Sequence, residues 1–196
     1  MDKIDYKIIE ELKEDGRKKF SDIARIVGLS RVAVASRLKK LVDTGKIRIY
    51  PEINLKEQKM IMAVILIESR DEERRENILE QYSSCPRVLL TGTAYGHYDI
   101  FALIFAEDRE LLEILLSSCI LKKIDGINKS SVMIVGELLK PGFLPIKRYN
   151  KRNISSIAPC GLDCSECTKF KQHICIACPL TTTYRGKLFQ SDKEGL

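Results

Sequence analysis

The stretch from Phe20 to Gly45 constrains the fold of this chain more than any other. Its apolar residues recur every three or four positions, stop at Gly28 and resume as a second stripe. The first group is Ile23, Ile26 and Val27, and the second is Val34, Leu38 and Leu41. Gly28 tolerates the positive φ of a tight corner, and the hydroxyl of Ser30 can cap the helix that follows. This pattern predicts a helix-turn-helix, whose second helix enters the major groove of DNA. A helical hairpin that only packs is the alternative.

Polar side chains of the second helix are the candidates for DNA contact. They are Arg31, Ser36, Arg37, Lys39 and Lys40. Arg31 lies in the first turn, where an arginine can bond a guanine through two hydrogen bonds. Lys39 and Lys40 lie further along and are expected on phosphates. Their apolar neighbours offer little direct readout, so DNA shape is expected to supply part of the specificity. For each residue, a solvated charged face is the alternative.

The charge distribution agrees with contacts to a polyanion. Residues 1–54 carry a net charge of +4, residues 55–140 carry −3 and residues 141–196 carry +5. A further amphipathic helix precedes the motif, so residues 1–45 are expected to form a three-helix DNA-binding domain. Residues 46–59 are expected to be a linker that begins with a short strand over Gly45–Pro51. We expect double-stranded DNA as the partner.

Residues 60–140 alternate signals for strands and helices. Strands are expected at 60–68, 87–95, 98–106 and 131–138, and helices are expected to start after Ser69 and Asp108. The order β-α-β-β-α-β predicts a ferredoxin-like domain with four antiparallel strands and two helices on one face. The fold class is therefore α+β. Dimerisation would cover the bare face of such a sheet.

The first 140 residues resemble the Lrp/AsnC (feast/famine) family of transcription regulators. The matching segments are Ile4–Asp5, Asp15–Arg17, Phe20–Ala24, Val27–Ser30, Arg37–Leu41, Gly45–Ile47 and Gly96–Asp99. The resemblance implies a swapped strand after the helix-turn-helix, and a second domain that dimerises, assembles further and binds an amino acid. It also implies a structural or DNA-backbone role for Arg37.

The segment around Gly96 resembles the turn near the effector site of that family. Gly96, Tyr98 and Asp99 are therefore the candidates for effector binding. Gly96 can turn the chain sharply, and Asp99 can pair with the ammonium group of a small effector such as an amino acid. An ordinary hairpin turn is the alternative.

Five of the seven cysteines lie in the last quarter of the chain. They are Cys160, Cys164, Cys167, Cys175 and Cys178. Pairs two residues apart can converge on one soft cation, and a tetrahedral site needs four thiolates. Residues 159–196 are therefore expected to be a cysteine-rich metal-binding extension, joined by a basic linker over 141–158. Cys85 and Cys119, beside apolar residues, are expected in the core.

The identity of the metal stays open. Structural zinc is the commoner occupant of paired cysteines, whereas the fifth cysteine and the Cys178–Pro179 ending favour an iron–sulfur cluster. A cluster would make the protein sensitive to oxidation, and zinc would make the extension a structural module. Unliganded thiols are the third interpretation.

Composition places the chain among ordinary globular proteins. Charged residues are 31% and hydrophobic residues 44% of the sequence. The longest apolar run, Met60–Ile67, is too short to cross a membrane, and the start of the chain is charged, so a cytoplasmic location is expected. No catalytic constellation stands out, which favours a non-enzymatic regulator. The alternatives are an effector-binding or assembly protein with a structural zinc module, and an iron–sulfur electron-transfer protein.

Overall fold

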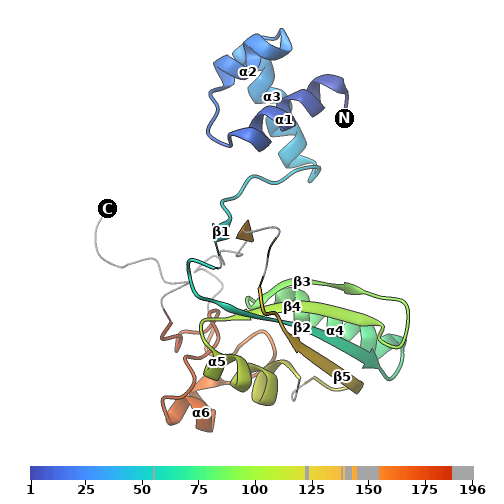
Figure 1. Ribbon diagram of the computed structural model, residues 1–196, viewed down its shortest axis with the longest axis vertical. Coiled ribbons are helices and arrows are strands. Elements are labelled where there is room, and N and C mark those ends of the chain that lie inside the picture. Colours follow the sequence, from blue (N-terminus) through green and yellow to red (C-terminus); the bar gives the residue numbers. More distant parts are fainter. Residues whose placement is uncertain (55, 122–123, 138, 140–142, 145–154, 187–196) are drawn as a thin grey trace. The chain divides into compact units, whose positions relative to one another are not determined.

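The protein is described by a computed structural model that covers residues 1–54, 56–121, 124–137, 139, 143–144 and 155–186. It divides into two compact units, one formed by Met1–Pro51 and the other beginning at Glu52 (Figure 1). The expected basic linker lies largely outside the described residues. No helix of the described part is long and apolar enough to cross a membrane.

Three helices form the first unit. They are α1 (Lys3–Glu14), α2 (Phe20–Val27) and α3 (Arg31–Asp43). The side chain of Asp2 caps α1, and the hydroxyl of Ser30 caps α3 by accepting from the Ala33 amide at 3.1 Å. Gly28 ends α2 with φ 72°, the left-handed conformation that the corner requires. The apolar faces meet in a core centred on three side chains with no exposed surface, Ile8, Ile23 and Val34. The helix-turn-helix is confirmed.

The expected strand over Gly45–Pro51 is wrong. Residues 47–50 have no regular secondary structure, and the first strand is β1 (Ile53–Asn54). It pairs antiparallel with β6 (Phe143–Leu144). A strand exists only where a partner offers its backbone, and the alternation in the sequence does not contain that information.

A four-stranded antiparallel sheet forms the centre of the second unit (Figure 1). Its strands are β2 (Ile61–Ser69), β3 (Val88–Thr93), β4 (Ile100–Ala106) and β5 (Ile127–Ile134), in the order β3-β4-β2-β5. The helices are α4 (Glu72–Ser84), α5 (Arg109–Ile114) and the π-helix η1 (Leu115–Ile120). Alternate residues of β2 and β4 form one core with these helices, so the helices cover one face of the sheet. The predicted ferredoxin-like α+β order is confirmed.

Two local details differ from the sequence prediction. Asp71, rather than Ser69, caps α4 by accepting from the Arg74 amide at 2.8 Å. The helix after Asp108 widens into η1, because six residues adopt π-helical hydrogen bonding directly after α5. Ser69 is used elsewhere, as a partner of Asp99.

The cysteine-rich extension consists of short turns. A 3₁₀ turn (Cys164–Glu166) leads directly into α6 (Thr168–Lys171). Cys167 N donates to Cys164 O at 3.3 Å, and Thr181 N donates to Cys178 O at 2.9 Å. Most cysteines thus lie at or beside turns, where the chain reverses and brings side chains distant in sequence together.

Candidate DNA-binding helix and cysteine-lined cavity

The outward face of α3 presents the predicted DNA-contacting residues. Arg31, Ser36, Lys39 and Lys40 are exposed, while Val34, Leu38 and Leu41 are buried on the opposite side. Val32 is also 76% exposed in the first turn, which is unusual for a large apolar side chain. An exposed valine at this place can contact the methyl group of thymine. The helix thus offers one arginine, one hydroxyl, two lysines and one apolar contact to DNA.

Arg37 joins two helices. Its Nη1 donates to Asp2 Oδ2 at 2.6 Å and to Asp5 Oδ1 at 2.9 Å, so the side chain ties α3 to the start of α1. Hydrogen bonds from backbone amides and from Arg37 hold the pKa values of both aspartates below the ordinary value. Arg37 therefore stabilises the packing of α3 against α1 within the helix-turn-helix.

The turn at Gly96 is built as the sequence predicts, and Asp99 has partners within it. Gly96 has φ 146°, which favours glycine. Asp99 Oδ1 accepts from the Ser69 amide at 2.8 Å, and its other oxygen accepts from the Ser69 hydroxyl. Burial opposes ionisation of Asp99, but these hydrogen bonds outweigh it and lower its pKa. Tyr98 is half-buried beside it. Asp99 thus connects β4 to the end of β2.

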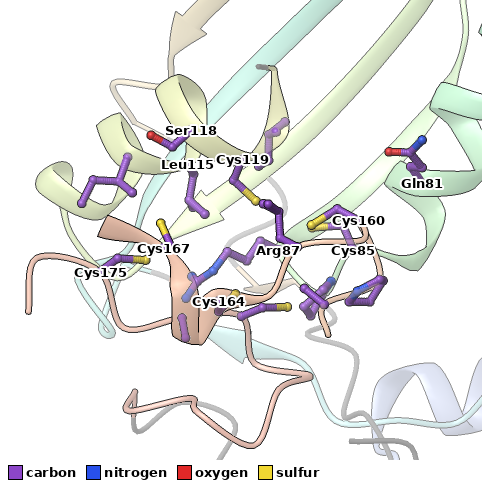
Figure 2. Close-up of a pocket in the computed structure, with 18 of the residues that line it drawn as sticks. Gln81, Cys85, Arg87, Leu115, Ser118, Cys119, Cys160, Cys164, Cys167 and Cys175 are labelled. Atoms are coloured by element: carbon purple, nitrogen blue, oxygen red, sulfur yellow. The ribbon is translucent and has the colours of Figure 1, made fainter. Parts of the chain in front are cut away.

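All seven cysteines line one cavity in the second unit (Figure 2). Cys160, Cys164, Cys167, Cys175 and Cys178 come from the extension, and Cys85 and Cys119 come from the ends of α4 and η1. The cavity has a volume of about 70 Å³, and its other walls include Leu115, Ala158 and Phe170. The structure therefore brings the five predicted cysteines together and adds two that sequence reasoning assigned elsewhere.

Cys85 and Cys119 were expected to be core residues, and this is only half right. Both are half-buried and pack against the main core, yet both also line the cavity. They lie 41 or more positions before Cys160 in the sequence, so no spacing rule connects them to the cluster. The only sequence signal was the high cysteine count itself.

Five of the thiols that line the cavity have a raised pKa. Burial raises the pKa of the Cys85, Cys164 and Cys175 thiols, and it raises that of Cys178 to about 12. The pKa of Cys119 is raised by a hydrogen bond with the Cys160 side chain and by burial. Neutral thiols in apolar surroundings are poor nucleophiles, which makes a disulfide-exchange centre a poor fit to this cavity.

One buried cation lies in the cavity wall. Arg87 is 2% exposed and forms an ion pair with Glu107, whose Oε1 accepts from Nη2 at 3.2 Å. Burial opposes the charge, but the hydrogen bonds with Glu107 outweigh it and raise the pKa of the guanidinium. Nε of Arg87 is buried and has no hydrogen-bond partner among the described residues. Sequence reasoning missed this residue, which lies two positions after Cys85.

The sulfurs surround the cavity without converging on one point. In the described part of the chain, no three histidine, cysteine or carboxylate side chains have the geometry to hold a metal ion. Tetrahedral zinc, with Zn–S bonds of about 2.3 Å, requires ligand sulfurs about 3.8 Å apart. The cysteines instead line a cavity whose volume could hold several water molecules.

Taken together, the two units define a class of protein: a helix-turn-helix DNA-binding protein with a ferredoxin-like second domain. Residues 1–42 match the model of the AsnC-type helix-turn-helix domain. An uncharacterised HTH-type transcriptional regulator of Pyrococcus furiosus is 34% identical over 73% of this chain and 97% of the relative. The HTH-type transcriptional regulator LrpA of Pyrococcus abyssi is 33% identical over 71% of this chain and 99% of its own. The chain belongs to the Lrp/AsnC family of transcription regulators.

Solved structures agree on the fold. AsnC of E. coli matches with a TM-score of 0.61 and 23% identity, covering 71% of this chain and 94% of that one. A transcriptional regulator of Neisseria meningitidis, solved in complex with L-Met, matches with a TM-score of 0.59 and 26% identity over 71% of this chain and 92% of that one. Each of these four relatives leaves more than a quarter of this chain unmatched.

Proposed function

We propose that this DNA-binding regulator is controlled by a metal bound by four cysteines drawn from Cys160, Cys164, Cys167, Cys175 and Cys178, with an iron–sulfur cluster favoured over zinc. The observation that carries the proposal is the single cavity lined by all five cysteines. Thiolates are the preferred ligands of soft and borderline cations. A metal-linked change in the second unit would alter DNA affinity through linkage.

The size of the cavity supports the choice of a cluster. A volume of about 70 Å³ corresponds to roughly five water-sized spaces. A single tetrahedrally coordinated ion would fill only part of this space. In a [4Fe–4S] cluster each cysteine binds a separate iron atom, so the ligand sulfurs stand further apart than they do around zinc. This agrees with sulfurs that surround a space instead of converging. Burial raises the pKa of the Cys164, Cys175 and Cys178 thiols, so binding of a metal as thiolates would release protons.

DNA recognition is proposed for the exposed face of α3. Arg31 would read a base edge, and Ser36, Lys39 and Lys40 would contact phosphates, while Arg37 supports the helix from its place against α1. A homodimer or higher oligomer would present two such helices to successive major grooves. The role is that of a regulator without catalytic activity, in line with the names of its relatives.

A small effector such as an amino acid is the second proposed signal. The Neisseria relative was solved with L-Met, and the turn with Gly96, Tyr98 and Asp99 is the candidate site here. The Ser69 contacts occupy both Asp99 oxygens on one side. A carboxylate has about four acceptor positions, so Asp99 can still accept from an ammonium group.

DNA binding is tested with the full chain and the DNA upstream of its own gene. Specific binding should persist over excess competitor DNA and weaken steeply as salt rises. Binding with no preference for any sequence would favour the effector-binding or assembly alternative.

The metal is tested on protein purified without oxygen. We expect broad visible absorption, iron and acid-labile sulfide, and a change of DNA affinity when the cluster is removed by oxidation. Stoichiometric zinc with no visible absorption would replace the redox switch by a structural module. A cluster whose removal leaves DNA affinity unchanged would favour electron transfer.

A further inference from the structure

We propose that the metal site is shared between the extension and the sheet domain: Cys119 supplies one of the four ligands and cysteines of the extension supply the other three, while the Nε–H of Arg87 donates to a sulfur of the bound group. This inference rests on the metal-dependent function proposed above. It adds two residues from outside the cysteine-rich extension and names the role of each.

Cys119 faces the extension across the cavity. It lines the same cavity as Cys160 (Figure 2), although 40 residues separate the two in the sequence. Cys119 lies in η1, the one stretch of π-helix among the described residues. Such stretches are rare and occur frequently at functional sites, because the wider turn redirects side chains. Here it places Cys119 in the cavity wall together with Leu115 and Ser118.

Arg87 supplies what an anionic sulfur site needs. Four thiolates around a metal carry excess negative charge, and a buried guanidinium beside them offsets it. Arg87 lines the cavity together with Cys85 and Cys175 (Figure 2). Two of its nitrogens are used by Glu107, while Nε is buried with no partner in the described structure. An unpaired buried donor destabilises a fold, so a sulfur acceptor at this place resolves an otherwise unfavourable feature.

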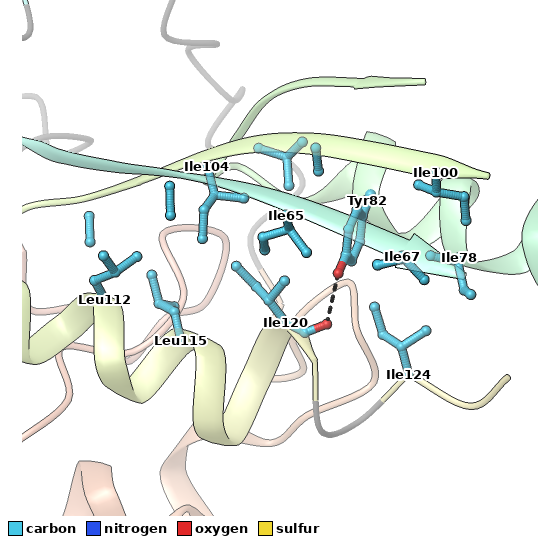
Figure 3. Close-up of a cluster of buried hydrophobic side chains, with 14 of the residues drawn as sticks. Ile65, Ile67, Ile78, Tyr82, Ile100, Ile104, Leu112, Leu115, Ile120 and Ile124 are labelled. Carbon is cyan, nitrogen blue, oxygen red and sulfur yellow. Dashed lines mark hydrogen bonds between the residues drawn. The ribbon is translucent and has the colours of Figure 1, made fainter. Parts of the chain in front are cut away.

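A shared site also provides the route of the signal. Leu115 and Ile120, at the two ends of η1, pack into the core under the sheet, and Ile120 O accepts from the Tyr82 hydroxyl at 3.2 Å (Figure 3). A metal bound by Cys119 would therefore join η1, which already contacts α4 through this hydrogen bond, to the extension. Loss of the metal releases this connection, with each ligand thiolate taking back a proton from solvent.

The ligand role is tested with Cys119→Ala and Cys119→Ser in the full chain purified without oxygen. We expect iron and sulfide content to fall several-fold and visible absorption to be lost or altered. Ser118→Ala, the adjacent position in the same cavity wall, is the matched control and should retain the cluster. Circular dichroism of the metal-free forms checks that the variants fold. Wild-type iron, sulfide and spectrum in both Cys119 variants would overturn the ligand role.

The donor role is tested with Arg87→Lys, which keeps the positive charge and lacks Nε. Hydrogen bonds to sulfur stabilise the reduced cluster, so the variant should have a lower reduction potential. Glu107→Gln perturbs the ion pair and leaves Nε in place, so it should shift the potential much less. Equal shifts in the two variants, or none, would overturn the donor role.

Metal content separates failure of the proposed function from failure of the shared site. If the wild-type protein carries no metal, the proposed function fails and the shared site with it. If the wild type carries a cluster and the Cys119 variants keep it unchanged, only the shared site fails.

Discussion

The hydroxyl of Tyr184 donates a hydrogen bond of 3.1 Å to Oε1 of Glu107. This contact joins the extension to the end of β4, and the same carboxylate holds the buried guanidinium of Arg87. One acidic side chain therefore connects the extension, the sheet and the wall of the cysteine-lined cavity. The Glu107 carboxylate therefore both holds the extension through Tyr184 and balances the positive charge of Arg87 in the cavity wall.

Tyr184→Phe should loosen the extension without unfolding the rest. Removal of one such hydrogen bond costs about 1 kcal/mol, and Glu107 keeps its arginine partner. Hydrogen exchange should accelerate over residues 155–186 and stay unchanged over α1–α3. Tyr95→Phe, at a fully exposed tyrosine of the same unit, is the control. Unchanged exchange in the extension would show that the contact does not hold it.

Arg37→Met should lower the thermal stability of the helix-turn-helix at pH 7. The aspartates that Arg37 holds have pKa values below the ordinary 3.8. Their stabilising contribution is therefore complete above that value and is lost as the pH falls through the lowered pKa values. The difference between wild type and variant should shrink below about pH 4.

Circular dichroism melting at pH 7 and pH 3 measures this effect, and hydrogen exchange over residues 3–14 assigns it to α1. Arg25→Met removes an exposed ion pair with Asp22 and should change little. A difference that stays constant down to pH 3 would contradict the assigned role of Asp2 and Asp5.

Arg31→Ala should weaken specific DNA binding by about 1–3 kcal/mol and relax the preference at one base pair. The reason is that a bidentate arginine contact discriminates against the wrong base. The change in base preference is measured from the affinities of wild type and variant for a panel of single-base variants of the operator. A uniform loss on every sequence would instead place Arg31 on a phosphate.

Lys39→Ala and Lys40→Ala should weaken binding to all sequences alike. Each removes one phosphate contact, so the slope of log affinity against log salt should fall by about one. Lys129→Ala, an exposed lysine of the second unit, should leave the slope unchanged. A loss confined to one operator position would reassign the lysine to a base.

Gly126→Ala should destabilise the second unit by about 1–3 kcal/mol. Gly126 has φ +93°, and an added Cβ would stand 2.5 Å from the Cβ of Arg74 in α4. Denaturant unfolding measures the loss. Gly136→Ala has open space and should be close to neutral, so equal effects at the two positions would contradict the steric explanation.

Local signals in the sequence predict the fold well where neighbours along the chain determine it. Gly28, Ser30 and Asp108 act on backbone within a few residues, and each occupies its predicted place. The prediction fails where a distant partner intervenes. Ser69 does not cap α4 because Asp99, 30 residues away, accepts from it, and β1 exists because residues 143–144 pair with it.

The candidate site shows the same division. The spacing of Cys164, Cys167, Cys175 and Cys178 predicts that they belong together, and they do line one cavity. Nothing local distinguishes Cys85 or Cys119 from ordinary apolar residues, because their relation to the cluster arises only when the extension packs against α4 and η1. Arg87 is likewise a common charged residue until burial leaves its Nε without a partner among the described residues.

The two-part cavity wall has a consequence for biosynthesis. Residues up to Ile124 supply one wall, and Ala158 to Cys178 supply the other, so the chamber closes only late in translation. The segments of the helix-turn-helix and of the sheet are synthesised before Cys178, the last cysteine of the cavity, and domains generally fold in that order. A newly made chain would therefore pass through a stage in which its helix-turn-helix is folded and the cavity is still open on one side. If the proposed metal binds there, its insertion would be the final step of maturation.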